Sequence, residues 1–301
     1  MKLPLKRLRY ALGETVINVI EIVMTHMPLR LIHVLTDTLC LLLYPIIVLM
    51  PAFRATVIKN LKIAFGNELS GREIRRIARR SMRNLFRMPG DILYYGFPKN
   101  LEHLKRDVTV TGMGHLTDAL KKGRGVIGLG AHMTGFLLLT VRLSHSGIPF
   151  IVPTKDPRNQ MLKKKLRGWR DLSGVRYIDV DSVDKGKKEI TDCLANNEIV
   201  YLIADERKKR DGMPVPFFGK EALTAVGPAV FSLKTGAPIV PILIADKKEG
   251  LVIDILPPLN GAAGHEQHSV TDLTILANRA IEDYIRAYPD QWVWTQQRWR
   301  L

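Results

Sequence analysis

The stretch that decides the fold is Gly125-Val-Ile-Gly-Leu-Gly-Ala-His132, an apolar run that ends on a histidine. A second run of the same kind, Ile199-Val-Tyr-Leu-Ile-Ala204, ends on Asp205 and Glu206. Short apolar runs bounded by polar residues are typical of strands buried in a parallel sheet. In open α/β sheets, sites gather outside the carboxyl ends of the strands. If the two strands are parallel, the histidine and the carboxylates emerge at the same edge of the sheet.

Around these two strands, β-rich runs alternate with helical stretches after about residue 100. The expected strands are 108–112, 125–130, 150–153, 176–180, 199–204, 239–244 and 251–255, and the expected helices are 134–145, 157–172, 184–196, 222–235 and 270–287. This alternation favours an α/β fold with a mixed, largely parallel sheet flanked by helices. We therefore expect an α/β domain over residues 101–301, preceded by an N-terminal helical, membrane-associated region over residues 1–100.

The N-terminal region contains two apolar segments, Val16–Met27 and Leu39–Met50. Each is shorter than the roughly 20 apolar residues that a spanning helix needs. We expect two helices that lie in or against a membrane interface. The alternative is that both are buried helices of a soluble core.

A strongly basic helix is expected at Ser70–Arg87. Ser70 is a candidate N-cap, and Glu73 completes a capping box. Arginines follow one strip of the helix, at positions 72, 75, 76, 79, 80, 83 and 87, beside a strip of apolar residues. A basic amphipathic helix fits an anionic membrane surface or an acidic protein, while the alternative is a solvated face on an ordinary packed helix.

The whole chain is basic, with 45 Lys and Arg against 29 Asp and Glu and a formal charge of +16. Such an excess indicates an anionic partner. A nucleic acid is disfavoured, because no recognition motif and no interleaving of basic and aromatic residues is found. Cys40 and Cys193 are expected to be buried hydrophobes, and no Cys/His spacing suggests a metal site.

The residues after the second strand are strongly polar. Asp205 and Glu206 run into the basic sequence 207–210, which begins with Arg207. Carboxylates and cations beside His132 suit proton transfer and anion binding, although such a run can also be a plain charged loop. Farther on, Phe217 and Phe218 belong to the apolar segment 213–219, which lines an apolar channel or simply packs. The C-terminal tryptophans 292, 294 and 299 either pack in the core or anchor at a membrane interface.

Four blocks, in family order and covering most of the chain, resemble the lipid A biosynthesis late acyltransferase family within the lysophospholipid acyltransferase superfamily. They are Asn60–Phe65 followed by the basic helix; the strand that ends in Gly130-Ala-His132; the segment from Asp205 through Val215-Pro-Phe-Phe-Gly219 to Thr235-Gly-Ala-Pro-Ile-Val-Pro241; and Pro289-Asp-Gln-Trp-Val-Trp294 with Arg298-Trp299.

The resemblance implies transfer of a fatty acyl group from a thioester, acyl-carrier protein or acyl-CoA, to a hydroxyl of a membrane glycolipid such as a lipid A precursor. No bound cofactor is implied beyond that co-substrate. The implied partners are an anionic membrane surface, an acyl-carrier protein and the glycolipid acceptor, with no nucleic acid. The implied location is the cytoplasmic face of the bacterial inner membrane, with the chain peripheral or N-terminally anchored.

The family's general base maps to His132, and a family arginine maps to Arg170. The family's Asp-Gln pair maps to Asp205 and Glu206, so the second position departs from the pattern. We place the catalytic role on His132 and Asp205. The expected substrate-binding residues are Arg170, Glu206, Arg207, Phe217 and Phe218.

The larger departure lies in the catalytic motif, where the family has His followed after four residues by Asp or Glu. Here that position is Leu137, which cannot accept the imidazole N–H or stabilise an imidazolium. Three explanations are open: a carboxylate from elsewhere, Asp205 or Glu206, orients His132; a backbone carbonyl does so; or the chain binds acyl lipid or carrier without catalysis. Our hypothesis is that Asp205 takes the role.

Overall fold

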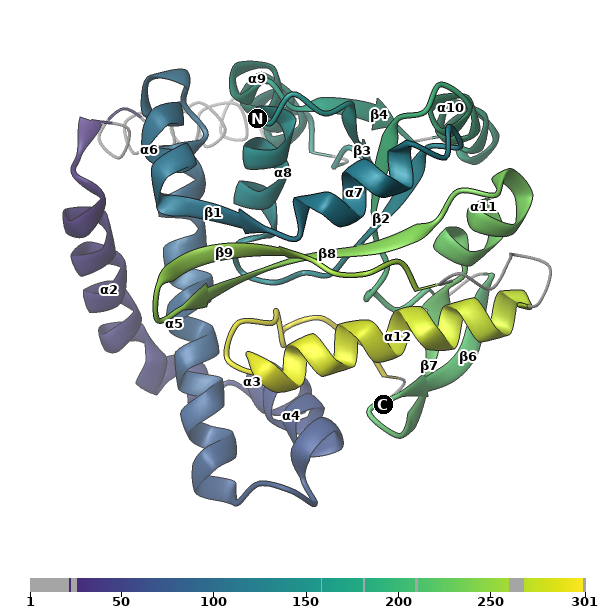
Figure 1. Ribbon diagram of the computed structural model, residues 1–301. Helices are drawn as coiled ribbons and strands as arrows, with labels where there is room; N and C mark the ends of the chain where they lie inside the picture. Colours follow the sequence, from purple (N-terminus) through teal and green to yellow (C-terminus); the bar gives the residue numbers. More distant parts are fainter. Residues whose placement is uncertain are drawn as a thin grey trace, which may run out of the picture.

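The computed structural model describes residues 22, 26–157, 159–180, 182–208, 211–259 and 268–299. The expected fold class is confirmed: a mostly parallel sheet is flanked by helices, and the apolar helix α2 stands at one side of the molecule (Figure 1). The expected apolar segment 16–27 lies almost entirely outside the described residues.

In the described residues, the main sheet has seven strands in the order β1-β9-β8-β2-β5-β3-β4. The five adjacent strands β8, β2, β5, β3 and β4 are parallel to one another. Strand β9 pairs antiparallel with β8, and β1 pairs parallel with β9. The bounds are β1 Val108–Thr111, β2 Val126–Gly130, β3 Phe150–Thr154, β4 Arg176–Asp179, β5 Ile199–Ile203, β8 Ile239–Lys247 and β9 Gly250–Ile255. All seven match expected strands.

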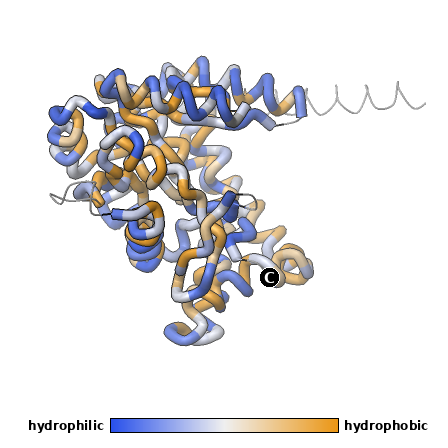
Figure 2. Tube along the Cα trace, turned by 90° about the vertical axis from the view of Figure 1, so that its right-hand side faces the viewer, coloured by the Kyte–Doolittle hydropathy of each residue, from blue (hydrophilic) through white to orange (hydrophobic). Residues whose placement is uncertain are grey.

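Helices cover the sheet and bury its apolar strands. Those in contact with the sheet or with one another are α6 Leu101–Asp107, α7 Met113–Leu120, α8 Phe136–Ser144, α9 Gln160–Ser173, α10 Val183–Ala195, α11 Gly227–Thr235 and α12 Val270–Ala287. Hydrophobic and hydrophilic residues alternate along the outer helices, as Figure 2 shows. Strand β2 at the centre is buried along its whole length, which is why its sequence is wholly apolar.

The expected helix 222–235 is wrong in its first part. A hairpin of β6 (Gly212–Phe217) and β7 (Lys220–Ala225) occupies this region, and α11 begins only at Gly227. Its two turn residues, Phe218 and Gly219, both have positive φ (51° and 67°), as a tight two-residue hairpin turn requires. The prolines of β6 hid this strand from pattern analysis, since proline is tolerated in strands only at edges.

The second apolar N-terminal helix is longer than expected. Helix α2 runs continuously from Leu29 to Leu49, and this helix is long and apolar enough to cross a membrane by length and composition. The residues before Leu39 include two, His33 and Asp37, whose polar side chains have partners on α5 (Gly71–Tyr95). His33 pairs with Asp91, and Asp37 pairs with arginines of α5. A polar side chain with a partner on the next helix does not interrupt a helix.

Helix α5 begins as expected at the Ser70 N-cap, and the capping box with Glu73 is confirmed. The helix continues past Pro89 to Tyr95, farther than the pattern indicated. The arginines of the strip differ in their surroundings along the helix. Arg83 and Arg87 bind Asp37 of α2, whereas the arginines of the first turns are exposed.

Candidate active site

His132 and Asp205 are brought together by the parallel pairing of β2 and β5. The register joins Gly130 to Ile203, so each strand ends two residues before its functional residue. The glycines of β2 allow this approach, because a Cβ at Gly130 would collide with the Tyr201 ring of β5. The expectation that both side chains leave the same sheet edge is confirmed.

The two side chains are in direct contact. His132 Nδ1 lies 2.7 Å from Asp205 Oδ1, and the His132 backbone N–H donates to Asp205 Oδ2 at 2.8 Å. An ionised carboxylate only accepts hydrogen bonds, so Nδ1 carries the proton and donates it. The lone pair of the imidazole is therefore on Nε2, the nitrogen that can take a proton from another molecule.

Asp205 is fully buried, and three donors converge on its Oδ2 atom. Beside the His132 N–H, the Trp292 indole donates at 2.6 Å and the Gln296 amide at 3.3 Å. Burial raises the pKa of Asp205, but the charge and hydrogen bonds of His132 and the bond from Trp292 lower it by more, so it lies below its usual range. The carboxylate therefore stays ionised despite its burial.

The Nε2 side of His132 is the open side of the site. The imidazole is 23% exposed, and the Phe136 ring packs against it with 5.2 Å between centroids. Glu206 Oε1 lies 3.6 Å from Nε2, on a side chain that is 69% exposed. Burial lowers the pKa of His132, but Asp205 and, more weakly, Glu206 raise it by more, so the net pKa is raised.

The C-terminal segment forms a wall of the site. The Val293 N–H donates to the His132 carbonyl at 3.0 Å, and Met133 pairs with Trp292. Asn60 of α4 (Lys59–Phe65) donates to the carbonyl of Trp294, and α5 binds the same segment through Ser81 and the carbonyl of Trp292. Helices α4 and α5 thus hold the C-terminal segment that contacts His132, although they lie more than 200 residues from it in the chain.

Leu137 lies in the first turn of α8 and supplies no acid. Of the three explanations for its presence, the structure contains the contact that the first requires, a carboxylate from another strand on Nδ1. The carboxylate is Asp205; Glu206 reaches the opposite nitrogen.

The described contacts of the other two expected cations, Arg170 and Arg207, are with groups other than the imidazole. Arg170, on α9, is buried against Asp156 at 3.0 Å and stacks on the Tyr177 ring at 5.0 Å. Arg207 follows Glu206 and forms a backbone bridge with Thr224 of β7. None of the contacts described for either arginine is with His132.

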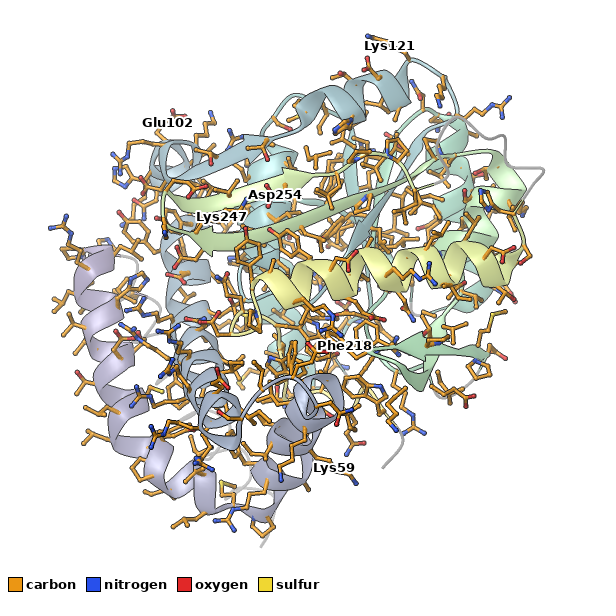
Figure 3. The ribbon with its side chains drawn as sticks, turned by 60° about the horizontal axis from the view of Figure 1, so that its bottom comes forward. Lys59, Glu102, Lys121, Phe218, Lys247 and Asp254 are labelled. Carbon is orange, nitrogen blue, oxygen red and sulfur yellow. The ribbon has the colours of Figure 1, made fainter. Side chains whose placement is uncertain are left out.

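Phe217 and Phe218 are packed in the core. Phe217 is fully buried and Phe218 is 6% exposed, in a cluster of aromatic rings with Phe65 and the three C-terminal tryptophans 292, 294 and 299. Figure 3 shows Phe218 among crowded side chains next to α12. The packing alternative is therefore the correct one, and neither ring lines a described cavity. The tryptophans are buried as well, so the interfacial alternative is wrong for them.

Two members of the site were not found from the sequence. Trp292 and Gln296 bind Asp205 from a segment about 90 residues away, through an indole N–H and an amide. The only available signal was that a buried carboxylate needs donors. Among the described residues, no group of three His, Cys, Asp or Glu side chains gathers as metal ligands.

Fold and site together define an α/β protein whose sheet edge holds a histidine oriented by a buried carboxylate. Residues 2–301 match the model of the bacterial lipid A biosynthesis acyltransferase family, and the chain belongs to this family. Membership makes the chain an acyltransferase, in agreement with the resemblance of its four blocks.

Similar proteins carry names of two kinds. A phosphatidylinositol mannoside acyltransferase of Mycolicibacterium smegmatis is 25% identical over 224 residues, 73% of this chain and 69% of the relative. The lipid A biosynthesis lauroyltransferase of Escherichia coli is 24% identical over 65% of this chain and 63% of its own length. The palmitoleoyltransferase of the same organism is 25% identical over 64% of this chain and 61% of its own length.

Proposed function

We propose that the protein transfers a fatty acyl group from an acyl thioester to a hydroxyl of a membrane glycolipid, with His132 as general base and Asp205 as its orienting carboxylate. The observation that carries this proposal is the 2.7 Å contact between Nδ1 and Asp205, which leaves Nε2 unprotonated on the open side. The thioester is carried by acyl-carrier protein or coenzyme A. The acceptor belongs to the glycolipids named for the relatives, a lipid A precursor or a mannosylated inositol lipid.

In the first step, Nε2 takes the proton of the acceptor hydroxyl as its oxygen attacks the thioester carbonyl carbon. The imidazolium that forms is stabilised by the buried charge of Asp205. In the second step, the tetrahedral intermediate collapses, the C–S bond breaks, and Nε2–H returns the proton to the thiolate. The products are an ester and a free thiol, and His132 regains its starting state.

Glu206 lies where the acceptor hydroxyl approaches. Its carboxylate is 3.6 Å from Nε2 and mostly exposed, so it can turn aside or accept a neighbouring hydroxyl of the headgroup. A carboxylate here favours an acceptor rich in hydroxyl or amine donors, since a carboxylate accepts hydrogen bonds.

The proposed membrane location is supported by the exposed apolar surface of α2. Its apolar side chains are exposed along most of the helix, among them Leu41 and Leu49, which are 72% and 68% exposed. Large exposed apolar surfaces mark membrane or protein contacts. We place the protein at the cytoplasmic face of the inner membrane, where acyl thioesters and the glycolipid acceptor meet.

The test is an acyl-transfer assay with the full chain in detergent, acyl-carrier protein thioester and each glycolipid acceptor. His132→Ala is expected to reduce transfer by at least about 10³-fold, the scale of losing a catalytic base. His33→Ala is the matched control, because His33 is similarly exposed and also paired with an aspartate. Undiminished transfer in His132→Ala would contradict the mechanism, and no transfer by the wild type with any acceptor would favour a binding role.

A further inference from the structure

A groove separate from His132 lies at the lower end of the N-terminal helices. It has a volume of about 580 Å³ and is lined by the end of α2, the π-helix η1 (Arg54–Ile58), α4 and the start of α5. Its lining residues are Val48, Arg54, Ile58, Lys59, Lys62, Gly71, Ile74 and Arg75. None of them belongs to the candidate active site.

The lining combines an apolar floor with cations. Val48, Ile58 and Ile74 supply the apolar surface, and four basic side chains surround it without any acidic residue in the lining. Among the ion pairs formed by the described residues, none involves Arg54, Lys59, Lys62 or Arg75, whereas Arg83 and Arg87 farther along α5 are paired with Asp37. Figure 3 shows Lys59 at the outer side of these helices.

The groove is held open by local structure. The chain leaves α2 at Met50, turns into a short helix (Pro51–Phe53) and widens into η1. Arg54 Nε donates to the Val48 carbonyl at 3.0 Å, which fastens η1 to the end of α2. Widened π turns inside helices are costly and occur frequently at functional sites.

The groove lies at the C-terminal end of α2, whose last turns carry exposed apolar side chains. Leu42, Ile46 and Leu49 are 66%, 62% and 68% exposed, and the groove begins beside Leu49, at Val48. A helix with such a surface places its end, and therefore the four cations, where acyl chains give way to headgroups. A lipid phosphate at the headgroup level would lie beside these four cations, which form no ion pair among the described residues. The acyl chain of the same lipid would lie on the apolar floor of the groove.

We infer that this groove binds one anionic phospholipid of the bilayer, with an acyl chain on the apolar floor and the phosphate among Arg54, Lys59, Lys62 and Arg75. The inference does not depend on the proposed acyl transfer. An acidic carrier protein would also be attracted by the cations, but a concave apolar floor fits a chain better than the polar surface of a folded protein.

The test is lipid retention by the detergent-purified full chain, measured by native mass spectrometry in micelles with equal amounts of phosphatidylglycerol and phosphatidylcholine. The wild type is expected to retain one phosphatidylglycerol in preference to phosphatidylcholine. Lys59→Gln/Lys62→Gln is expected to weaken this retention about thirtyfold, since each cation near an anionic lipid is worth about 1 kcal/mol. Arg72→Gln/Arg76→Gln, which removes two exposed cations of α5 that do not line the groove, is expected to retain the lipid.

The proposed binding of the acyl chain is tested by a substitution that fills the groove. Gly71 lies in its wall, and a Cβ there would meet only Arg75 Nη1, at an ordinary 3.5 Å. Gly71→Phe is expected to abolish retention of both lipids without loss of folding, since Gly71 is exposed at the first residue of α5 and a Cβ there meets only the flexible end of Arg75. Gly114→Phe is the matched control, on the open surface of α7.

Three results would overturn the inference. The first is a wild type that shows no preference for phosphatidylglycerol, and the second is an equal loss in the two double variants, which would indicate general surface charge. The third is unchanged lipid retention in Lys59→Gln/Lys62→Gln together with weaker binding of acyl-carrier protein, which would make the groove a carrier-docking surface.

Discussion

Two histidine–aspartate pairs in this protein have nearly the same length and very different surroundings. His132 and Asp205 are 2.7 Å apart at the edge of the sheet, and His33 and Asp91 are 2.6 Å apart between α2 and α5. The histidines are similarly exposed, at 23% and 28%, but Asp205 is fully buried while Asp91 is 22% exposed.

The pairs also use opposite nitrogens. Asp205 holds Nδ1 of His132 and leaves Nε2 on the open side, whereas Asp91 holds Nε2 of His33. The first arrangement suits proton transfer to an incoming molecule, and the second ties one helix to another. A His–Asp contact alone therefore does not indicate a catalytic pair, and the proposed role of His132 rests on the burial of its acid and on the nitrogen that stays free.

The largest expected effect comes from Asp205→Asn. Three donors point at Oδ2, so the asparagine oxygen takes that place and its NH₂ faces Nδ1 of His132. Nδ1 then accepts, the proton moves to Nε2, and the base is lost. We expect transfer to fall by about 10³- to 10⁴-fold.

The pH dependence sharpens the same comparison. The unprotonated imidazole is the active form, and Asp205 raises the pKa of His132, so activity falls as the pH drops through that raised pKa. In Asp205→Asn, the residual activity should begin to fall at a lower pH than the activity of the wild type does. Asp91→Asn is the control, with transfer within about twofold and the free energy of unfolding reduced by no more than about 1 kcal/mol. Equal losses of transfer in the two variants would remove the distinction between the pairs.

A smaller effect is expected for Trp292→Phe, which removes the indole N–H from Asp205 and keeps most of the ring packing. A hydrogen bond to a buried charge is worth about 1.5–3 kcal/mol, so the free energy of unfolding should fall by about that amount, with about a tenfold loss of transfer. Trp294→Phe is the matched control, because its indole donates to the Pro289 carbonyl instead. Chemical denaturation and kcat/KM measure the two effects, and a larger loss of transfer in Trp294→Phe would contradict the role of Trp292.

The smallest effect is expected for Glu206→Gln. The carboxylate is mostly exposed and contributes only weakly to the raised pKa of His132. The acid limb of the pH–rate profile should move to lower pH, by less than in Asp205→Asn, and the maximal rate should change by less than about fivefold. A change of acceptor preference without a change in the limb would assign Glu206 to headgroup binding alone.

Much of the fold could be predicted from the sequence because strands and helix ends depend on local residue patterns. Apolar runs predicted the seven sheet strands and placed His132 and Asp205 at strand ends. The helix N-cap pattern predicted the capping box of Ser70 and Glu73. The β6–β7 hairpin was missed because its strands carry prolines and its turn begins with Phe218 in a positive-φ conformation. The expected length of helix α2 was too short because His33 and Asp37 interrupt the apolar pattern, and their partners lie on α5, which is distant in the sequence.

In the site, the apolar runs were enough to predict that a histidine and a carboxylate end two strands, and the family resemblance identified Leu137 as standing in place of an acid. Only the tertiary structure decided that Asp205 takes Nδ1, that Trp292 and Gln296 hold its second oxygen, and that Phe217 and Phe218 pack in the core. The two kinds of feature differ in the sequence separation of the residues that determine them. Strand ends are set by neighbours a few residues away, whereas hydrogen-bond partners and burial depend on segments that are far apart in the chain and meet only in the folded protein.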